Sequence, residues 1–225
     1  MSKSKIVRTF VATALAAGLL AACNLALPAP IELDGGVFGL DGMPVTLTHD
    51  AAAVSPSVVL VTAFSGTINE SFEIDPLDIP AALRRAFRIA SVDEAIGLDF
   101  TLEVTSGATL PGTITVSAAS LTDVVVRRGG KMVFSGDFST VPVPGGTMTF
   151  SQGTCEADAC PYTTTATAAL VDISLTGDEA DKLAKAIFSG GDFTVTASFA
   201  VTVEPALSSD TSIEAVLVSL GAVLE

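Results

Sequence analysis

The stretch DFTVTASFAVTVE, residues 192–204, alternates strictly between apolar side chains and polar or small ones. Its apolar positions recur at every second residue, which is the period of a β-strand with one buried face. They are Phe193, Val195, Ala197, Phe199, Val201 and Val203. Because antiparallel sheets with one solvated face show this alternation, the stretch predicts a mainly β fold built from antiparallel strands.

Other segments of the chain repeat the pattern. The clearest is LDFTLEVT, residues 98–105, with its leucine, phenylalanine and valine side chains on one face. Weaker alternation predicts strands over residues 45–48, 57–68, 113–117, 121–126, 131–138, 147–151, 165–175 and 213–220. Turn-forming residues separate them, and Arg128-Gly129-Gly130-Lys131 predicts a tight hairpin. We therefore expect an antiparallel β-sandwich or a curved sheet.

Two short helices are expected to pack on this sheet. The first spans about residues 80–89, with Asp78 as its N-cap and Pro80 near its first turn. The second spans 178–188, with a capping box over 176–179 and a stop at Gly190-Gly191. Its apolar stripe consists of Ala180, Leu183, Ala184 and Ile187. Both are too short to be stable without tertiary packing.

Residues 34–225 are predicted to form a single β-rich domain. An alternative is that this domain contains two similar halves. Each expected helix precedes a strand that opens Asp-Phe-Thr, at Asp99 and at Asp192, and the two triplets are offset by 93 residues. Three matched residues are thin support for a duplication, because Asp-Phe-Ser also occurs at Asp137.

The first residues have the pattern of an export signal. Lys3, Lys5 and Arg8 precede an apolar run over residues 10–22. A charged start followed by a short apolar segment is typical of a cleaved signal peptide. The run is shorter than the roughly 20 residues that a membrane-spanning helix needs. We expect residues 1–22 to be removed.

Leu20-Ala21-Ala22-Cys23 resembles the lipobox of bacterial lipoprotein signal peptides. The resemblance covers only about the first 24 residues, and an ordinary signal peptide with an incidental cysteine is the alternative. It implies that the thiol of Cys23 is acylated and that the chain is cut just before it. In Gram-negative bacteria an aspartate after the cysteine is the usual inner-membrane retention signal, whereas here Asn24 follows. The resemblance therefore implies a lipid-anchored protein of the cell envelope, held at the outer membrane.

The segment after the cysteine predicts a tether. Residues 23–33 include two prolines and carry no charge before Glu32. Such a segment favours a stiff, extended conformation of roughly 3 Å per residue. The folded domain should lie close to the bilayer.

The charge of the chain excludes one class of partner. The formal net charge is −14, and removal of the three cations in residues 1–22 would make it −17. Outside the signal, the cations form only two clusters, Arg84, Arg85 and Arg88, and Arg127, Arg128 and Lys131. A strongly acidic surface repels phosphates, so we expect no binding of nucleic acid.

Two cysteines remain besides Cys23. Cys155 and Cys160 lie in QGTCEADACPYTTT, and export places the chain where disulfides form. We expect the two to form a disulfide across a loop. A redox pair or half of a metal site is the alternative, but the spacing is not that of a Cys-x-x-Cys motif.

Candidates for catalysis or metal binding are few. His49 is the only histidine and lies beside Asp50, at the end of an expected strand. No Gly-x-Ser-x-Gly motif accompanies it. Acidic residues cluster at 70–78 and at 178–181. Both clusters are explained by a solvated loop that leads into a helix N-terminus, which favours negative charge. Neither cluster has the spacing of an EF-hand calcium site. The glycine-rich stretch DGGVFGLDG, residues 34–42, lacks the Lys-Ser/Thr of a phosphate loop and predicts a turn-rich approach to the first strand.

These observations favour a non-enzymatic, lipid-anchored envelope protein that binds another macromolecule or supports an envelope assembly. It would contact the membrane through the anchor at Cys23 and require no metal or other cofactor. The alternative is a carrier of an apolar ligand, in which small side chains leave room for a cavity. They are Ala166, Ala168, Ala169, Ala197 and Ala200. A hydrolase that uses His49 ranks third.

Overall fold

The computed structural model describes residues 25–26, 30–33, 36–49, 62–76, 87–105, 113–140, 146–155, 159–165, 169–204 and 212–225. In this part of the chain the strands are β1 (Leu25–Ala26), β2 (Ile31–Glu32), β3 (Pro44–Thr46), β4 (Thr48–His49), β5 (Thr62–Ile74), β6 (Phe87–Arg88), β7 (Ser91–Thr105), β8 (Thr113–Arg128), β9 (Lys131–Thr140), β10 (Thr147–Gln152), β11 (Ala159–Thr164), β12 (Ala169–Thr176), β13 (Gly191–Glu204) and β14 (Ser212–Leu224). The helix is α2 (Gly177–Ser189). The predicted mainly β fold is confirmed.

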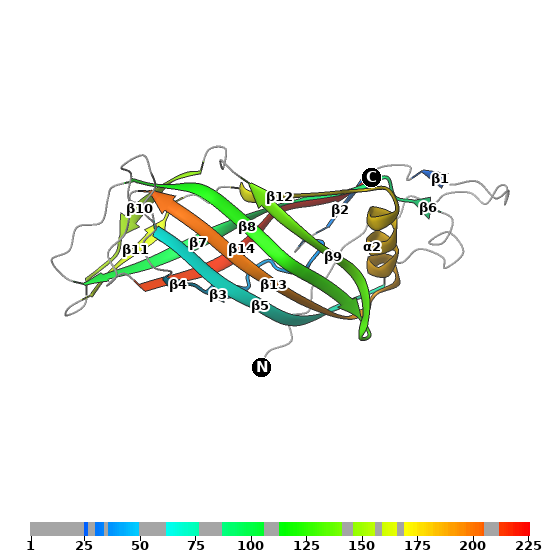
Figure 1. Ribbon diagram of the computed structural model, residues 1–225, viewed down its shortest axis with the longest axis horizontal. Helices are drawn as coiled ribbons and strands as arrows, with labels where there is room; N and C mark the ends of the chain where they lie inside the picture. The colour runs from blue at the N-terminus through cyan, green and yellow to red at the C-terminus, as the bar shows by residue number, and fades with distance from the viewer. Residues whose placement is uncertain are drawn as a thin grey trace.

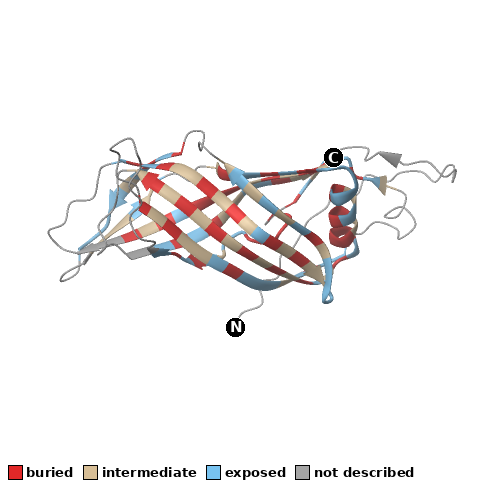
Figure 2. Cartoon of the chain, viewed as in Figure 1, coloured by how far each residue is buried: buried red, intermediate tan, exposed pale blue. Residues whose placement is uncertain are grey.

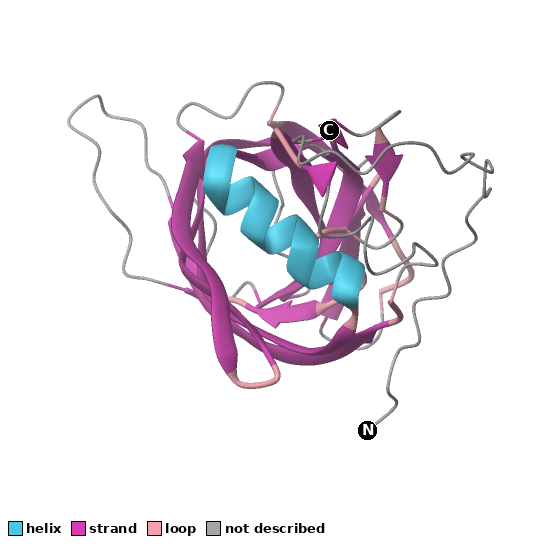
Figure 3. Ribbon diagram, turned by 90° about the vertical axis from the view of Figure 1, so that its right-hand side faces the viewer, coloured by secondary structure: helices cyan, strands magenta, loops and turns pink. Residues whose placement is uncertain are grey.

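Twelve of these strands form one antiparallel sheet. Its path runs β2-β14-β7-β11-β10-β8-β13-β5-β4, with β12 beside β7, β3 beside β14 and β9 beside β8. The sheet has two walls, one built on β7 and β14 and the other on β8 and β13. β10 joins them, because its residues 147–149 pair with β8 and its residues 150–152 pair with β11, which pairs with β7. Figure 3 shows the sheet curving around a central interior. Within the described residues the path stays open, so the curved-sheet expectation is confirmed.

The interior of the curve is the core. Along β13 every second residue is buried, as the alternation over 192–204 predicts, and the buried positions of neighbouring strands line up in bands (Figure 2). Buried side chains from both walls belong to one continuous cluster. The hairpin at 128–131 is confirmed, with positive φ at Gly129 and Gly130, which matches the two-residue turn that suits twisted strands.

Helix α2 lies across one end of the curved sheet (Figures 1 and 3). The predicted helix at 178–188 is confirmed, and all four residues of its expected stripe are buried. Its stop at Gly190 is also confirmed, because this glycine has a φ of 60° and donates its N–H to Ile187 O. The predicted capping box is wrong in one respect, since Thr176 makes no side-chain cap hydrogen bond. None of the helices in the described residues has the length and apolarity needed to cross a membrane.

The helix expected at about 80–89 is wrong at its C-terminal end. Phe87 and Arg88 form β6, which pairs in parallel with β1. The chain is extended there because the N–H groups of Ala90 and Ser91 both donate to Glu225 O, which leads it directly into β7. Residues 77–86, including Asp78 and Pro80, lie outside the described residues.

Several strands differ from the expected bounds, and β5 extends to Ile74 where the expected strand ends at residue 68. β7 begins at Ser91 rather than at Leu98, and β8 is continuous where two strands were expected. A register shift interrupts the β8–β9 pairing around Asp123, which has a φ of 52°. β11 was not expected at all. The two Asp-Phe-Thr triplets also occupy different places, because Asp99 lies within β7 whereas Asp192 lies at the start of β13.

Candidate functional site

The glycine-rich loop, residues 36–42, enters the interior of the curved sheet. The chain on either side of it follows the edge of β14, where Leu33 N–H donates to Ala222 O and Gly42 N–H donates to Leu217 O. Between these two bonds the loop leaves the edge, and the side chains of Val37, Phe38 and Leu40 are buried. The expectation of a turn-rich approach to the first strand therefore missed the main feature, which is that the loop fills the core.

The side chain of Phe38 extends from the loop across the interior of the sheet. Its side chain has no exposed surface, and its ring lies 5.9 Å from that of Phe134 and 6.4 Å from that of Phe138, measured between centroids. Both partners belong to β9, which is paired to the opposite wall of the sheet. The loop thus connects the β14 side of the interior with the β9 side.

The carboxyl group of Glu94 holds this loop in place. Glu94 lies on β7, between the buried residues Val92 and Ile96, and is 3% exposed. Its Oε2 accepts a hydrogen bond from Val37 N–H at 2.9 Å, and its Oε1 accepts one from the Ser219 hydroxyl at 3.0 Å. Phe38 N–H also donates to the carboxyl group. A single side chain therefore ties together the loop, β7 and β14.

Burial raises the pKa of Glu94 to about 7. Removal from water is the dominant cause, because it penalises the charged form. The hydrogen bonds from Ser219, Val37 and Phe38 act in the opposite direction, and the charge of Asp41 adds a smaller increase. Asp41 accepts the N–H of Ser219 at 3.0 Å, so it lies close to the same cluster. The site can bind or release a proton near neutral pH.

The surroundings of Glu94 favour a structural role over acid–base catalysis. A catalytic carboxyl must reach a substrate, whereas the loop covers Glu94 and its oxygens are already engaged. The sequence offered only one signal for this residue, an acidic side chain at an inward position of an alternating segment. The first half of β7 was not predicted, because Glu94 interrupts the alternation of apolar residues there.

Gly36 tests how tightly the loop is fitted to Glu94. A Cβ at Gly36 would collide with Glu94 Oε1 and lie 2.9 Å from Ser219 Oγ. A Cβ at Gly42 would meet nothing within 4 Å, although the two glycines have similar φ values of 79° and 74°. Gly42→Ala is therefore a matched control for the strain of positive φ.

We expect Gly36→Ala to lower the free energy of unfolding by about 1–3 kcal/mol more than Gly42→Ala does. The difference is the cost of displacing a hydrogen-bonded, buried carboxyl group. Urea denaturation followed by circular dichroism measures it. Equal losses for the two variants would contradict the fitted contact between the loop and Glu94.

The predicted disulfide is present. Cys155 and Cys160 are joined, with their Cα atoms 4.2 Å apart, and the bond closes the loop between β10 and β11. At this end of the molecule Gly153 N–H also donates to Pro161 O. The pair staples a loop, as expected.

The other expected site residues do not converge. Cys23 lies outside the described residues. His49 ends β4, where its backbone is opposite Phe64. Glu70 and Glu73 lie on β5 rather than in the expected loop, whereas Asp178, Glu179 and Asp181 lie in the first turns of α2. Within the described residues no group of three or more histidine, cysteine, aspartate or glutamate side chains is arranged to hold a metal ion.

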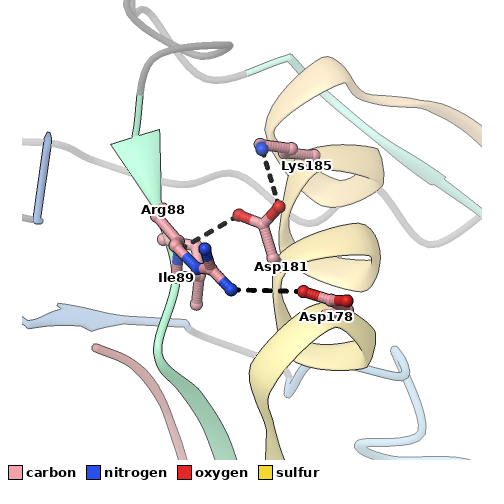
Figure 4. Close-up of polar contacts among 5 residues, drawn as sticks. All are labelled: Arg88, Ile89, Asp178, Asp181 and Lys185. Carbon is pink, nitrogen blue, oxygen red and sulfur yellow. Dashed lines mark hydrogen bonds and ion pairs between the residues drawn. The ribbon is translucent and has the colours of Figure 1, made fainter. Parts of the chain in front are cut away.

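The acidic first turns of α2 instead bind the chain that enters β7 (Figure 4). Asp181 accepts the N–H of Ile89 at 3.1 Å and pairs with Lys185 at 2.6 Å. Asp178 pairs with Arg88 at 3.2 Å, although its own side chain is 97% exposed. The carboxylate of Asp181 thus fixes the helix against the segment between β6 and β7.

Two of the pockets in the described part of the chain are small. One, of about 10 Å³, is lined by apolar side chains that include Phe100 and Met148. The other, of about 90 Å³, lies between β9 and α2 and is lined by residues that include Met132, Glu179 and Lys182. Pockets for organic ligands measure about 300–1,000 Å³. Neither pocket reaches that size.

Comparisons of the chain with protein-family models, with curated proteins and with solved structures find no match.

Proposed function

We propose that this chain is a lipid-anchored, non-enzymatic protein of the bacterial cell envelope that binds another macromolecule or supports an envelope assembly. The lipobox-like segment ending at Cys23 supports the anchor, and Asn24 supports the outer membrane as its location. Two acyl chains or more hold a protein on a bilayer, whereas one binds only reversibly. A domain anchored in this way needs no membrane-seeking surface of its own.

One observation carries the non-enzymatic part of the proposal. The interior of the curved sheet, where a β-fold of this shape would hold a ligand or substrate, is filled by the chain's own loop around Phe38. The buried carboxyl group in that interior, Glu94, is used to hold the loop. The pocket volumes of about 10 and 90 Å³ support the same conclusion over a carrier of apolar ligands.

The anchor is tested by Cys23→Ser. We expect the parent protein to fractionate with membranes and to carry a diacylglyceryl group at a mature N-terminal Cys23, as read by intact mass. The variant should lose both, because serine offers no thiol for acylation. A Cys155→Ser/Cys160→Ser double variant is the control, and it should stay in the membrane fraction.

Two results would contradict the proposal. A Cys23→Ser variant that keeps the same processed N-terminus and the same membrane association would rule out the anchor. A stoichiometric apolar molecule in the protein purified in mild detergent, detected by mass spectrometry of an organic extract, would favour the carrier instead.

A further inference from the structure

The polypeptide segment that follows Cys23 joins the domain at one defined end. In β1, Leu25 is paired with Phe87 and Ala26 with Arg88, so a single residue, Asn24, separates Cys23 from the first strand. Two residues span at most about 7 Å. β2 then pairs with Val223 and Leu224, whose neighbour Glu225 accepts the N–H groups of Ala90 and Ser91. Both attachments therefore lie at the same end.

Helix α2 is fixed to this same end by the contacts of Asp178 and Asp181 (Figures 1 and 4). The β8–β9 hairpin reaches it as well, because Arg128 on β8 donates to the carbonyls of Ser189 and Gly190 at the C-terminal end of the helix. We call this region the α2 end, defined by β1, β6, α2 and residues 127–131. The opposite end carries β10, β11 and the disulfide.

Positive charge is segregated to the α2 end. Six lysine and arginine residues lie in the described part of the chain, and every one of them belongs to this end. They are Arg88, Arg127, Arg128, Lys131, Lys182 and Lys185. Acidic residues occur at this end too, but beyond it the described charged residues are all acidic, including Asp99, Glu204 and Glu214. The molecule therefore has one end with an excess of cations, six against the three carboxylates of Asp178, Glu179 and Asp181, and one purely acidic end.

We propose that the α2 end lies against the phospholipid headgroups and that the disulfide end points away from the bilayer. This inference rests on the proposed acylation of Cys23, which brings the α2 end to the surface because only Asn24 separates Cys23 from β1. The charge distribution acts in the same direction. The negative potential of an anionic leaflet extends about one Debye length, ~10 Å, so it repels the acidic end most when that end is turned inward.

The test uses the acylated, full-length protein in vesicles of phosphatidylethanolamine and phosphatidylglycerol that carry a nitroxide on some headgroups. A fluorophore is attached at Lys131→Cys, at Lys182→Cys or at Thr113→Cys. Thr113 is an exposed residue at the opposite end of β8 from Arg128, on the order of 50 Å away along the strand. Each labelled variant should show the circular dichroism of the parent.

We expect the nitroxide to quench the labels at positions 131 and 182 several-fold more strongly than the label at 113. Equal quenching at the three positions, or stronger quenching at 113, would overturn the orientation. Because the protein in these vesicles is already acylated and bound, that result would leave the proposed anchor intact. Failure of the anchor would show in a separate experiment, because the Cys23→Ser variant would then stay in the membrane fraction.

A second measurement examines the charge contribution. Lys131→Glu/Lys182→Glu, labelled at Arg127→Cys, should be quenched less than the same label on the parent background in vesicles that contain phosphatidylglycerol. In vesicles of phosphatidylcholine the two should be equal. A loss of quenching that is the same in both kinds of vesicle would overturn the electrostatic part of the inference.

Discussion

Phe38→Ala is expected to lower the free energy of unfolding by about 3–5 kcal/mol, the loss typical of a large buried aromatic side chain. Phe38 has no exposed surface, and its ring contacts two rings on β9. Truncation would leave a cavity between the two walls of the sheet that the rest of the loop cannot fill. Circular dichroism during urea denaturation suits the measurement, because the chain contains no tryptophan.

Two controls sharpen this prediction. Phe38→Leu keeps most of the buried volume, so its loss should be clearly smaller than that of Phe38→Ala. Met132 lies on the same strand as Phe134, but its side chain is 55% exposed. Met132→Ala should therefore change the free energy of unfolding by no more than about 0.5 kcal/mol. A Phe38→Ala loss as small as that of Met132→Ala would show that the loop does not fill the interior.

The second large effect is that the free energy of unfolding varies with pH because of Glu94. Its pKa is raised from 4.5 to about 7 in the folded protein, so between these values the folded state binds a proton that the unfolded state has released. The stabilisation is fully present below about pH 4.5 and is lost as the pH rises through 7. The shift corresponds to about 3 kcal/mol.

Glu94→Gln isolates this contribution from the other carboxyl groups. Glutamine keeps the shape of the protonated side chain but does not titrate. The free energy of unfolding of the parent minus that of the variant should therefore fall by about 3 kcal/mol between pH 4 and pH 8. Urea denaturation of both proteins across this range measures it. A difference that does not vary with pH would mean that folding leaves the pKa of Glu94 at its ordinary value.

The elements that the sequence could predict are those whose pattern is local. Strict alternation placed β13, two glycines placed the β8–β9 hairpin, and a 3.6-residue stripe with a terminal glycine placed α2. The disulfide was predictable because only two cysteines remained for it. In each of these cases the deciding residues lie within about a dozen positions of one another.

The candidate site could not be predicted in the same way, because its contacts join distant parts of the chain. Val37 meets Glu94 across 57 residues, and Ser219 meets Glu94 across 125. A glutamate in an inward position looks like a break in a strand until its partners are known. β6 was missed for a related reason: its extended conformation depends on β1 and Glu225, which no local pattern at residues 80–89 records.

The position of β14 has a consequence for how the molecule folds. This last strand pairs with β7, β3 and β2, and it borders the loop that carries Phe38. Contacts between such widely separated segments slow folding, because a long loop must close before they form. In a nascent chain that still lacks residues 212–224, one side of β7 is unpaired. The loop that carries Phe38 then also lacks its backbone hydrogen bonds to β14. The complete core therefore requires residues 212–224, and a chain that still lacks them exposes apolar surface that favours aggregation.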